Sequence, residues 1–172
     1  YACAALDAGK HVCLDKPFAL SEAEVRRVLA AATARKKVFN LAMNWRSQPA
    51  GQSARELVRR GELGGVYHAQ SFILRRGGAP KFGTWFCRKD LAGGGSLLDI
   101  GVHFLDVCLY LIDNFEPAAV SGAAYCKLGP RGLGDGSWGM SDRGTFVFDV
   151  DDFSTALIKM KNGATVTLDT SW

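Results

Sequence analysis

An apolar run at residues 96–112 constrains the fold more than any other stretch of this chain. Asp99 and His103 lie four residues apart within it, and Asp106 and Tyr110 extend the same stripe. Because side chains at i and i+4 share one helical face, the run predicts a buried helix with a single polar stripe. An unpaired polar group in such a place costs roughly 2–7 kcal/mol. The stripe therefore indicates either satisfied structural residues or a site facing a cavity.

Both structural and functional interpretations fit this helix. Ser96-x-x-Asp99 has the pattern of a capping box, and a lone His in an apolar helix is often a satisfied core residue. A glycine triplet at 93–95 precedes the helix, and Gly101 lies inside it. A glycine within a helix costs about 1 kcal/mol relative to Ala, which is tolerable if something must approach the backbone closely. The combination favours a functional site.

A second motif follows a short predicted strand at residues 11–14. Asp15-Lys16-Pro17 comes directly after that strand. Ligands of open α/β sheets bind outside the carboxyl ends of the strands, and Pro17 restricts the conformation of Lys16. Taken alone, the motif could equally be an ordinary strand-to-helix turn.

The first part of the chain has the pattern of a βαβ unit. A helix is predicted at 21–36, with Ser21 as N-cap and Glu24 completing a capping box, and an apolar strand follows at 38–43. Strand, crossover helix and strand predict neighbouring strands of a parallel sheet.

The rest of the chain alternates helices with strands. The expected helix lies at 50–60, and the expected strands lie at 66–74, 118–127, 153–160 and 164–172. Asn162-Gly163 predicts a type I′ hairpin between the last two strands. The implied pairing of Leu157 with Leu168 and of Lys159 with Val166 mixes polar and apolar residues on both faces. We therefore expect helices to cover one face of the sheet and a partner subunit the other.

A glycine-rich loop is predicted at 128–144. Its six glycines indicate a disordered connection or a lid over a ligand, and Trp138, Met140, Asp142 and Arg143 favour the lid.

Composition excludes several classes of protein. The net charge of +4 comes from scattered basic residues rather than a basic stripe, which argues against nucleic-acid binding. No run of 18 apolar residues lacks a charge, so no membrane span is expected. The five cysteines are odd in number and have no C-x-x-C spacing, which favours a reducing, cytoplasmic location.

Together, these motifs resemble the Gfo/Idh/MocA family, the group of glucose-fructose oxidoreductase and inositol dehydrogenase. The segments that carry the resemblance are Ala8-Gly9-Lys10-His11-Val12, Asp15-Lys16-Pro17, Asn44-Trp45-Arg46-x-x-Pro49, Gly61-Glu62-Leu63-Gly64-Gly65-Val66, Gly93-Gly94-Gly95, Asp99-Ile100-Gly101-x-His103-x-x-Asp106, Asp152-Phe153 and Lys161-Asn162-Gly163-Ala164. They cover essentially the whole chain. Asp15 stands where the family usually has Glu.

The resemblance implies an α/β fold in two parts. Residues 1–45 would be the C-terminal remnant of a Rossmann dinucleotide-binding domain, and residues 46–172 an α+β domain with a mostly antiparallel open sheet. A family member should begin with a strand and a Gly-x-Gly-x-x-Gly turn that holds the cofactor pyrophosphate. This chain opens within a predicted helix instead, and Gly132-x-Gly134-x-Gly136 does not follow a strand. The chain is therefore expected to be a fragment, itself inactive.

The resemblance also implies hydride transfer between NAD or NADP and a hydroxyl-bearing carbon of a sugar, inositol or related polyol. His103 would be the general base, Asp99 would orient it or bind substrate hydroxyls, and Lys16 would stabilise the developing alkoxide. These three residues are expected to share one cleft. The residues expected to contact the cofactor are Asp15, Lys16, Pro17, Arg46 and Trp85. The partners implied are a small-molecule substrate and a second copy of the protein, bound through the C-terminal sheet.

Two other functions stay open at this point. Asp99, His103 and Asp106 could be metal ligands of a hydrolase, although no second ligand cluster is visible and the implied enzyme carries no metal. Alternatively, the fold could serve a non-catalytic binding subunit.

Overall fold

The computed structural model describes residues 1–136 and 146–172. The chain divides into two compact units, Tyr1–Met43 and Asn44–Trp172. The four side chains that favoured a lid, Trp138, Met140, Asp142 and Arg143, lie outside the described residues.

The first unit contains α1 (Ala2–Asp7), β1 (Val12–Leu14), α2 (Glu22–Ala34) and β2 (Phe39–Leu41). The two strands pair in parallel, with Val12 opposite Phe39, so the predicted βαβ unit is confirmed. A small core of Leu6, Val12, Val28 and Ala32 joins the helices to the strands.

The start of α2 follows the predicted cap. Ser21 Oγ accepts a hydrogen bond from the Glu24 backbone N–H at 3.3 Å. The Glu24 carboxylate accepts the Leu20 N–H at 2.9 Å, one residue before the position that a capping box uses. The helix therefore begins where the sequence indicates.

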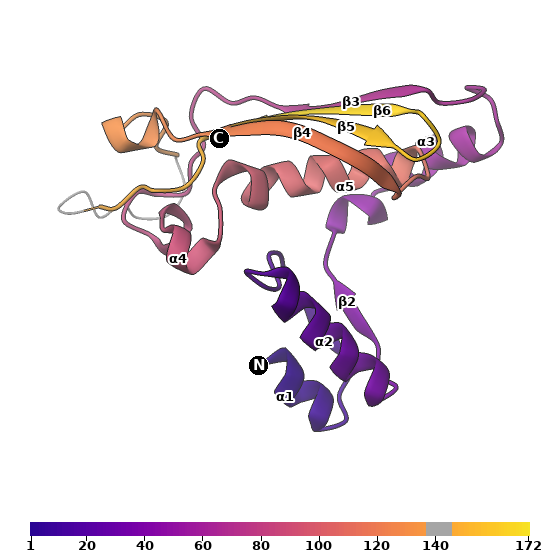
Figure 1. The fold of residues 1–172 in the computed structure, drawn as a ribbon, viewed down its shortest axis with the longest axis horizontal. Helices are drawn as coiled ribbons and strands as arrows, with labels where there is room; N and C mark the ends of the chain where they lie inside the picture. Colours follow the sequence, from indigo (N-terminus) through magenta and orange to yellow (C-terminus); the bar gives the residue numbers. More distant parts are fainter. Residues whose placement is uncertain (137–145) are drawn as a thin grey trace. The chain divides into compact units, whose positions relative to one another are not determined.

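The second unit places helices against one four-stranded sheet. Its elements are η1 (Asn44–Ser47), α3 (Pro49–Arg59), β3 (His68–Ile73), η2 (Trp85–Cys87), α4 (Lys89–Ala92), η3 (Leu97–Gly101), α5 (Val102–Leu111), β4 (Pro117–Tyr125), η4 (Gly129–Arg131), β5 (Phe153–Met160) and β6 (Thr165–Ser171). The strand order is β3-β6-β5-β4. β3 pairs with β6 in parallel, and the other two pairs are antiparallel. The sheet is thus mixed, and α5 runs along one face of it (Figure 1).

The core of this unit lies between α5 and the sheet. Ile158, Met160 and Val166 are almost fully buried there together with Cys108 of α5. Leu105, Leu109 and Ile112 of the helical segment pack against the same cluster. Burial alternates along β6, as expected for a strand with one covered face.

The hairpin between β5 and β6 corrects the predicted turn. Gly163 has a φ of 89°, whereas Asn162 is not left-handed, so the turn is not type I′. Met160 N donates to Ala164 O at 2.8 Å and closes a three-residue loop. The extra loop residue shifts the pairing by one position: Leu157 lies opposite Thr167, and Ile158 lies opposite Val166.

This register also corrects the prediction of two mixed faces. Ile158, Met160, Val166 and Leu168 all fall on the face toward α5, and each is 6% exposed or less. One face of the hairpin is therefore consistently buried.

One stretch, Lys89–Leu111, is long and apolar enough to cross a membrane when judged by length and composition alone. Core helices of soluble proteins pass the same test. Gly93, with a left-handed φ of 78°, ends α4 within this stretch, and α5 packs on the sheet. Within η3 and α5 only Gly101 and Cys108 are fully buried, so the helix packs on the sheet by one side and is not buried all round as predicted.

Candidate functional site

The helix that carries Asp99 and His103 begins with a π turn. Residues Leu97–Gly101 form η3, and α5 follows without a break. The prediction of a regular α-helix is therefore wrong in its first turn. π turns within helices are rare and are frequent at functional sites. Asp99 lies inside the π turn, and the half-buried His103 lies in the first turn of α5.

Asp151, which the sequence did not single out, caps this helix. Its carboxylate accepts the N–H of Gly95 at 2.7 Å, the N–H of Leu97 at 2.8 Å and the hydroxyl of Ser96 at 2.8 Å. Ser154 of β5 donates to it at 3.0 Å. The capping-box interpretation of Ser96 and Asp99 is wrong, because a carboxylate distant in sequence takes that role.

The glycines around the helix start mark close approach of the protein's own backbone and side chains. A Cβ on Gly95 would lie 2.0 Å from the carbonyl oxygen of Asp151. A Cβ on Gly101 would lie 3.0 Å from the Thr170 side chain of β6. The sequence predicts that some group approaches the helix backbone closely at these glycines. The approaching groups are Asp151 and Thr170.

Asp99 accepts a hydrogen bond from a buried indole. Trp172 Nε1 donates to Asp99 Oδ2 at 2.8 Å, just beyond the end of β6. Trp172 is 4% exposed and packs edge-on against Phe148, with ring centroids 6.1 Å apart. Residues 99 and 172 meet only through the tertiary fold, so spacing along the chain does not predict this pair.

Asp106, the next residue of the polar stripe, binds Arg46. Arg46 Nε donates to Asp106 Oδ2 at 2.7 Å, and its Nη2 donates to the other carboxylate oxygen. The guanidinium also lies over the rings of Tyr110 and Phe115, at 5.4 and 5.0 Å. Hydrogen bonding to Asp106 raises the pKa of Arg46. Arg46 therefore links η1 to α5. It provides contacts for two residues of the polar stripe, Asp106 and Tyr110.

Trp85 lies in η2 and is 46% exposed. Its indole stacks on the Phe86 ring with centroids 3.9 Å apart. Much of the Trp85 surface is thus accessible to a ligand.

In the first unit, Asp15-Lys16-Pro17 directly follows β1, as predicted. The Asp15 carboxylate is exposed and accepts the N–H of Lys16 at 2.8 Å, and the Lys16–Pro17 peptide is cis. Asp15 therefore shapes the turn that presents Lys16. The closeness of Lys16, in the first unit, to Asp99 and His103, in the second, stays a prediction.

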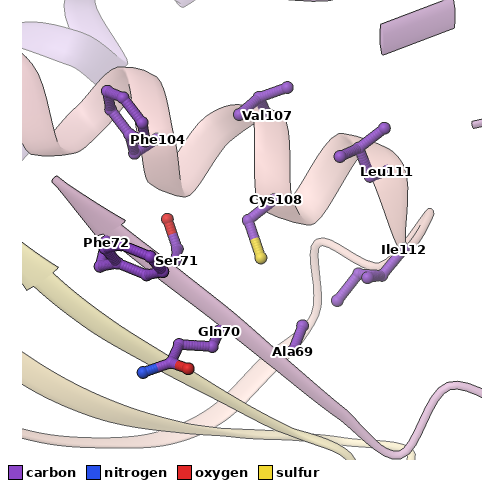
Figure 2. Close-up of a pocket in the computed structure, with 9 residues that line it drawn as sticks. All are labelled: Ala69, Gln70, Ser71, Phe72, Phe104, Val107, Cys108, Leu111 and Ile112. Carbon is purple, nitrogen blue, oxygen red and sulfur yellow. The ribbon is translucent and has the colours of Figure 1, made fainter. Parts of the chain in front are cut away.

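An apolar pocket of about 290 Å³ lies between α5 and β3 (Figure 2). Its polar side chains are Gln70, Ser71 and Cys108. Burial raises the pKa of the Cys108 thiol. The lining contains no carboxylate or imidazole, so this pocket is a poor candidate for acid–base chemistry. Within residues 1–136 and 146–172, no cluster of three His, Cys, Asp or Glu side chains could hold a metal ion, so the metal-hydrolase alternative gains no support.

Family models match nearly the whole chain. Residues 1–43 match the oxidoreductase family with an NAD-binding Rossmann fold, and residues 52–172 match the GFO/IDH/MocA C-terminal domain. The chain belongs to the Gfo/Idh/MocA oxidoreductase family. The resemblance and the two-part α/β fold inferred from the sequence are thereby confirmed.

Similar proteins include enzymes that act on sugars. D-glucoside 3-dehydrogenase of Escherichia coli is 34% identical over 98% of this chain and 47% of its own length. The crystal structure of an oxidoreductase domain protein from Kribbella flavida has a TM-score of 0.80 and 29% identity, over 99% of this chain and 46% of that one. Levoglucosan dehydrogenase in complex with NADH and L-sorbose has a TM-score of 0.77 and 25% identity, over 99% and 43%. The chain thus spans less than half the length of these relatives.

Proposed function

We propose that the protein is an NAD- or NADP-dependent dehydrogenase acting on a hydroxyl-bearing carbon of a sugar, inositol or related polyol. The observation that carries this proposal is the π-started helix with Asp99 and His103, in a chain whose family has an NAD-binding Rossmann fold. The sugar names of the relatives support the substrate class.

The first unit fits a nicotinamide cofactor. Asp15, Lys16 and Pro17 stand at the carboxyl end of a strand in a parallel pair, the edge at which open α/β sheets bind ligands. The cofactor supplies the hydride acceptor, or the hydride donor in the reverse reaction. Trp85 offers exposed aromatic surface that the cofactor could contact. Any contact of Arg46 with the cofactor would use the N–H groups of Arg46 that do not bind Asp106.

The side chains of this chain would handle the proton. In the oxidation, the substrate hydroxyl gives its proton to the His103 imidazole, while hydrogen leaves the same carbon as hydride and the C–O bond becomes C=O. A His has an ordinary pKa near 6.5, which suits this transfer. Lys16 would donate a hydrogen bond to the reacting oxygen and stabilise its negative charge. Asp99 would orient the imidazole or bind a neighbouring substrate hydroxyl.

We also propose that subunits pair through the outer face of the sheet. Leu157 and Phe72 are 49% and 57% exposed on that face, which the helices do not cover. All five cysteines are free, which supports a reducing, cytoplasmic location. Residues 1–172 alone are proposed to be inactive, because they span less than half the length of the relatives that are named as dehydrogenases.

Substitution of the two proton-handling residues tests the function in the intact enzyme. His103→Asn and Lys16→Met should each lower kcat by about 10²–10⁴-fold on the best sugar in a panel, with NAD and NADP assayed separately. His68→Asn and Lys10→Met are matched controls, since both residues are exposed and lie outside the proposed site. Near wild-type kcat in both test variants would exclude this mechanism. A wild-type enzyme that binds NAD(P) but turns over no sugar would favour the non-catalytic subunit.

A further inference from the structure

The strongest unassigned feature of the second unit is the hydrogen bond from Trp172 to Asp99. An indole N–H can donate but cannot accept, so a buried Trp needs an acceptor at a fixed place. Trp172 finds it in Asp99 Oδ2 at 2.8 Å. A donor aimed at a carboxylate makes a charge-assisted bond, which is stronger than one between neutral groups.

The indole is held by its own packing. Trp172 belongs to a buried cluster with Phe82, Cys87 and Phe148, and Ile100 packs against the same cluster. The Phe148 ring meets the indole edge-on, with an interplanar angle of 86°. The packing of the core therefore constrains the direction of the N–H.

The helix start is secured without Asp99. Asp151 takes the backbone N–H groups of Gly95 and Leu97, so the carboxylate of Asp99 is not needed as a cap. The bond from Trp172 engages one oxygen, Oδ2, and so fixes the plane of the carboxylate. It thereby restricts the orientations that the Asp99 carboxylate can adopt on the helix that carries His103.

We propose that Trp172 is a positioning residue that acts on catalysis through Asp99. This inference rests on the proposed dehydrogenase function. Trp172 itself touches neither substrate nor cofactor in this role. It orients the carboxylate that in turn orients His103 or binds a substrate hydroxyl. Catalytic sites generally need a second residue, itself fixed by packing, that holds each functional group in its working geometry.

The test uses Trp172→Phe in the intact enzyme. The Phe ring keeps most of the apolar body and removes the donor. We expect kcat to fall about 10- to 100-fold, the effect typical of losing a residue that orients a functional group, while the dissociation constant for NAD(P)H stays unchanged. Trp45→Phe is the matched control, because Trp45 packs on Phe104, with ring centroids 4.6 Å apart, and should keep wild-type kcat.

A double-mutant cycle separates positioning from packing. In an Asp99→Ala background, Trp172→Phe should lower kcat by less than about twofold, because residues that act as one unit are not additive. The indole N–H resonance of Trp172, identified by its loss in Trp172→Phe, should move in Asp99→Ala. If Trp172→Phe does not fold, benzothienylalanine at position 172 gives the same shape without the N–H.

The outcomes are distinguishable. An active wild type whose kcat is unaffected by loss of the N–H overturns the positioning role alone. The same is true if the full loss persists in the Asp99→Ala background. A wild type that oxidises no sugar overturns the proposed function, and the positioning role with it.

Discussion

Three neighbouring carboxylates, Asp149, Asp151 and Asp152, each accept backbone N–H groups from a different segment. Asp149 accepts the N–H of Lys89 at 2.6 Å, at the start of α4. The buried Asp152 accepts three consecutive N–H groups that lead into η4, at 2.6 to 3.0 Å. Backbone donors without a partner are costly when buried. The carboxylates of Asp149, Asp151 and Asp152 thus accept hydrogen bonds from backbone N–H groups at the starts of helices and turns.

Removal of the Asp151 carboxylate should destabilise the start of the Asp99 helix. Asp151→Ala leaves the N–H groups of Gly95 and Leu97 without their acceptor, and we expect a loss of about 2 kcal/mol in unfolding free energy. Asp149→Ala is the control, since that exposed carboxylate should cost less than 1 kcal/mol. Urea unfolding monitored by circular dichroism measures both. Equal losses in the two variants would contradict the capping role.

The thiol of Cys87 should be inert in the folded protein. Burial raises the pKa of this thiol to about 11, so near pH 8 only about one molecule in a thousand carries the thiolate. Cys13, by contrast, is exposed. Iodoacetamide labelling followed by mass spectrometry should modify Cys13 first and Cys87 only after unfolding in denaturant. Labelling of both at one rate in native buffer would show that Cys87 is accessible.

At the level of elements, the sequence predicted those features that depend on local pattern. The strand at 153–160, the N-cap at Ser21 and the apolar face of the Asp99 helix all follow from spacing along the chain. The register of β5 against β6 did not follow, because one additional loop residue shifts every pair. The contacts of Asp151 and Trp172 with the helix did not follow either. Both depend on tertiary packing between distant segments, which spacing does not encode.

Gly95 should be the least replaceable glycine at the helix start. Its Cβ would lie 2.0 Å from backbone oxygen, so Gly95→Ala must displace the Asp151 segment, and we expect a loss of about 3 kcal/mol. Gly65→Ala is the control, because nothing lies within 4 Å of that Cβ and the change should stay within about 0.5 kcal/mol. Thermal melts of the two variants provide the comparison. A Gly95→Ala protein as stable as wild type would show that this segment can move away at little cost.

For the molecule as a whole, the sheet of the second unit presents two unlike faces. On one face, β5 and β6 are buried under α5, whereas every residue of β4 is exposed; the other face carries exposed Leu157 and Phe72 beside polar strand residues. Large exposed apolar patches commonly mark interfaces between proteins.

Charge on the outer face should separate the proposed subunits. Leu157→Lys places two like charges in a two-fold interface, so we expect the mass measured by light scattering to fall to that of a monomer. Leu57→Lys on α3 is the control, because Leu57 is similarly exposed, at 44%, but lies outside the sheet. The intact enzyme should keep its oligomeric mass in that variant. An unchanged mass in Leu157→Lys would place the interface elsewhere.

The π turn at Leu97–Gly101 has a consequence for how this gene can change length. A π turn amounts to one extra residue within an α-helix, and each helical residue rotates the chain by about 100°. Deletion of a single codon here would restore a regular helix but rotate the segment before it by more than a quarter-turn against α5. Either Asp99 would leave the Trp172 indole, or Leu105 and Leu109 would leave the sheet. Active descendants of this gene should therefore accept substitutions in the turn far more readily than insertions or deletions.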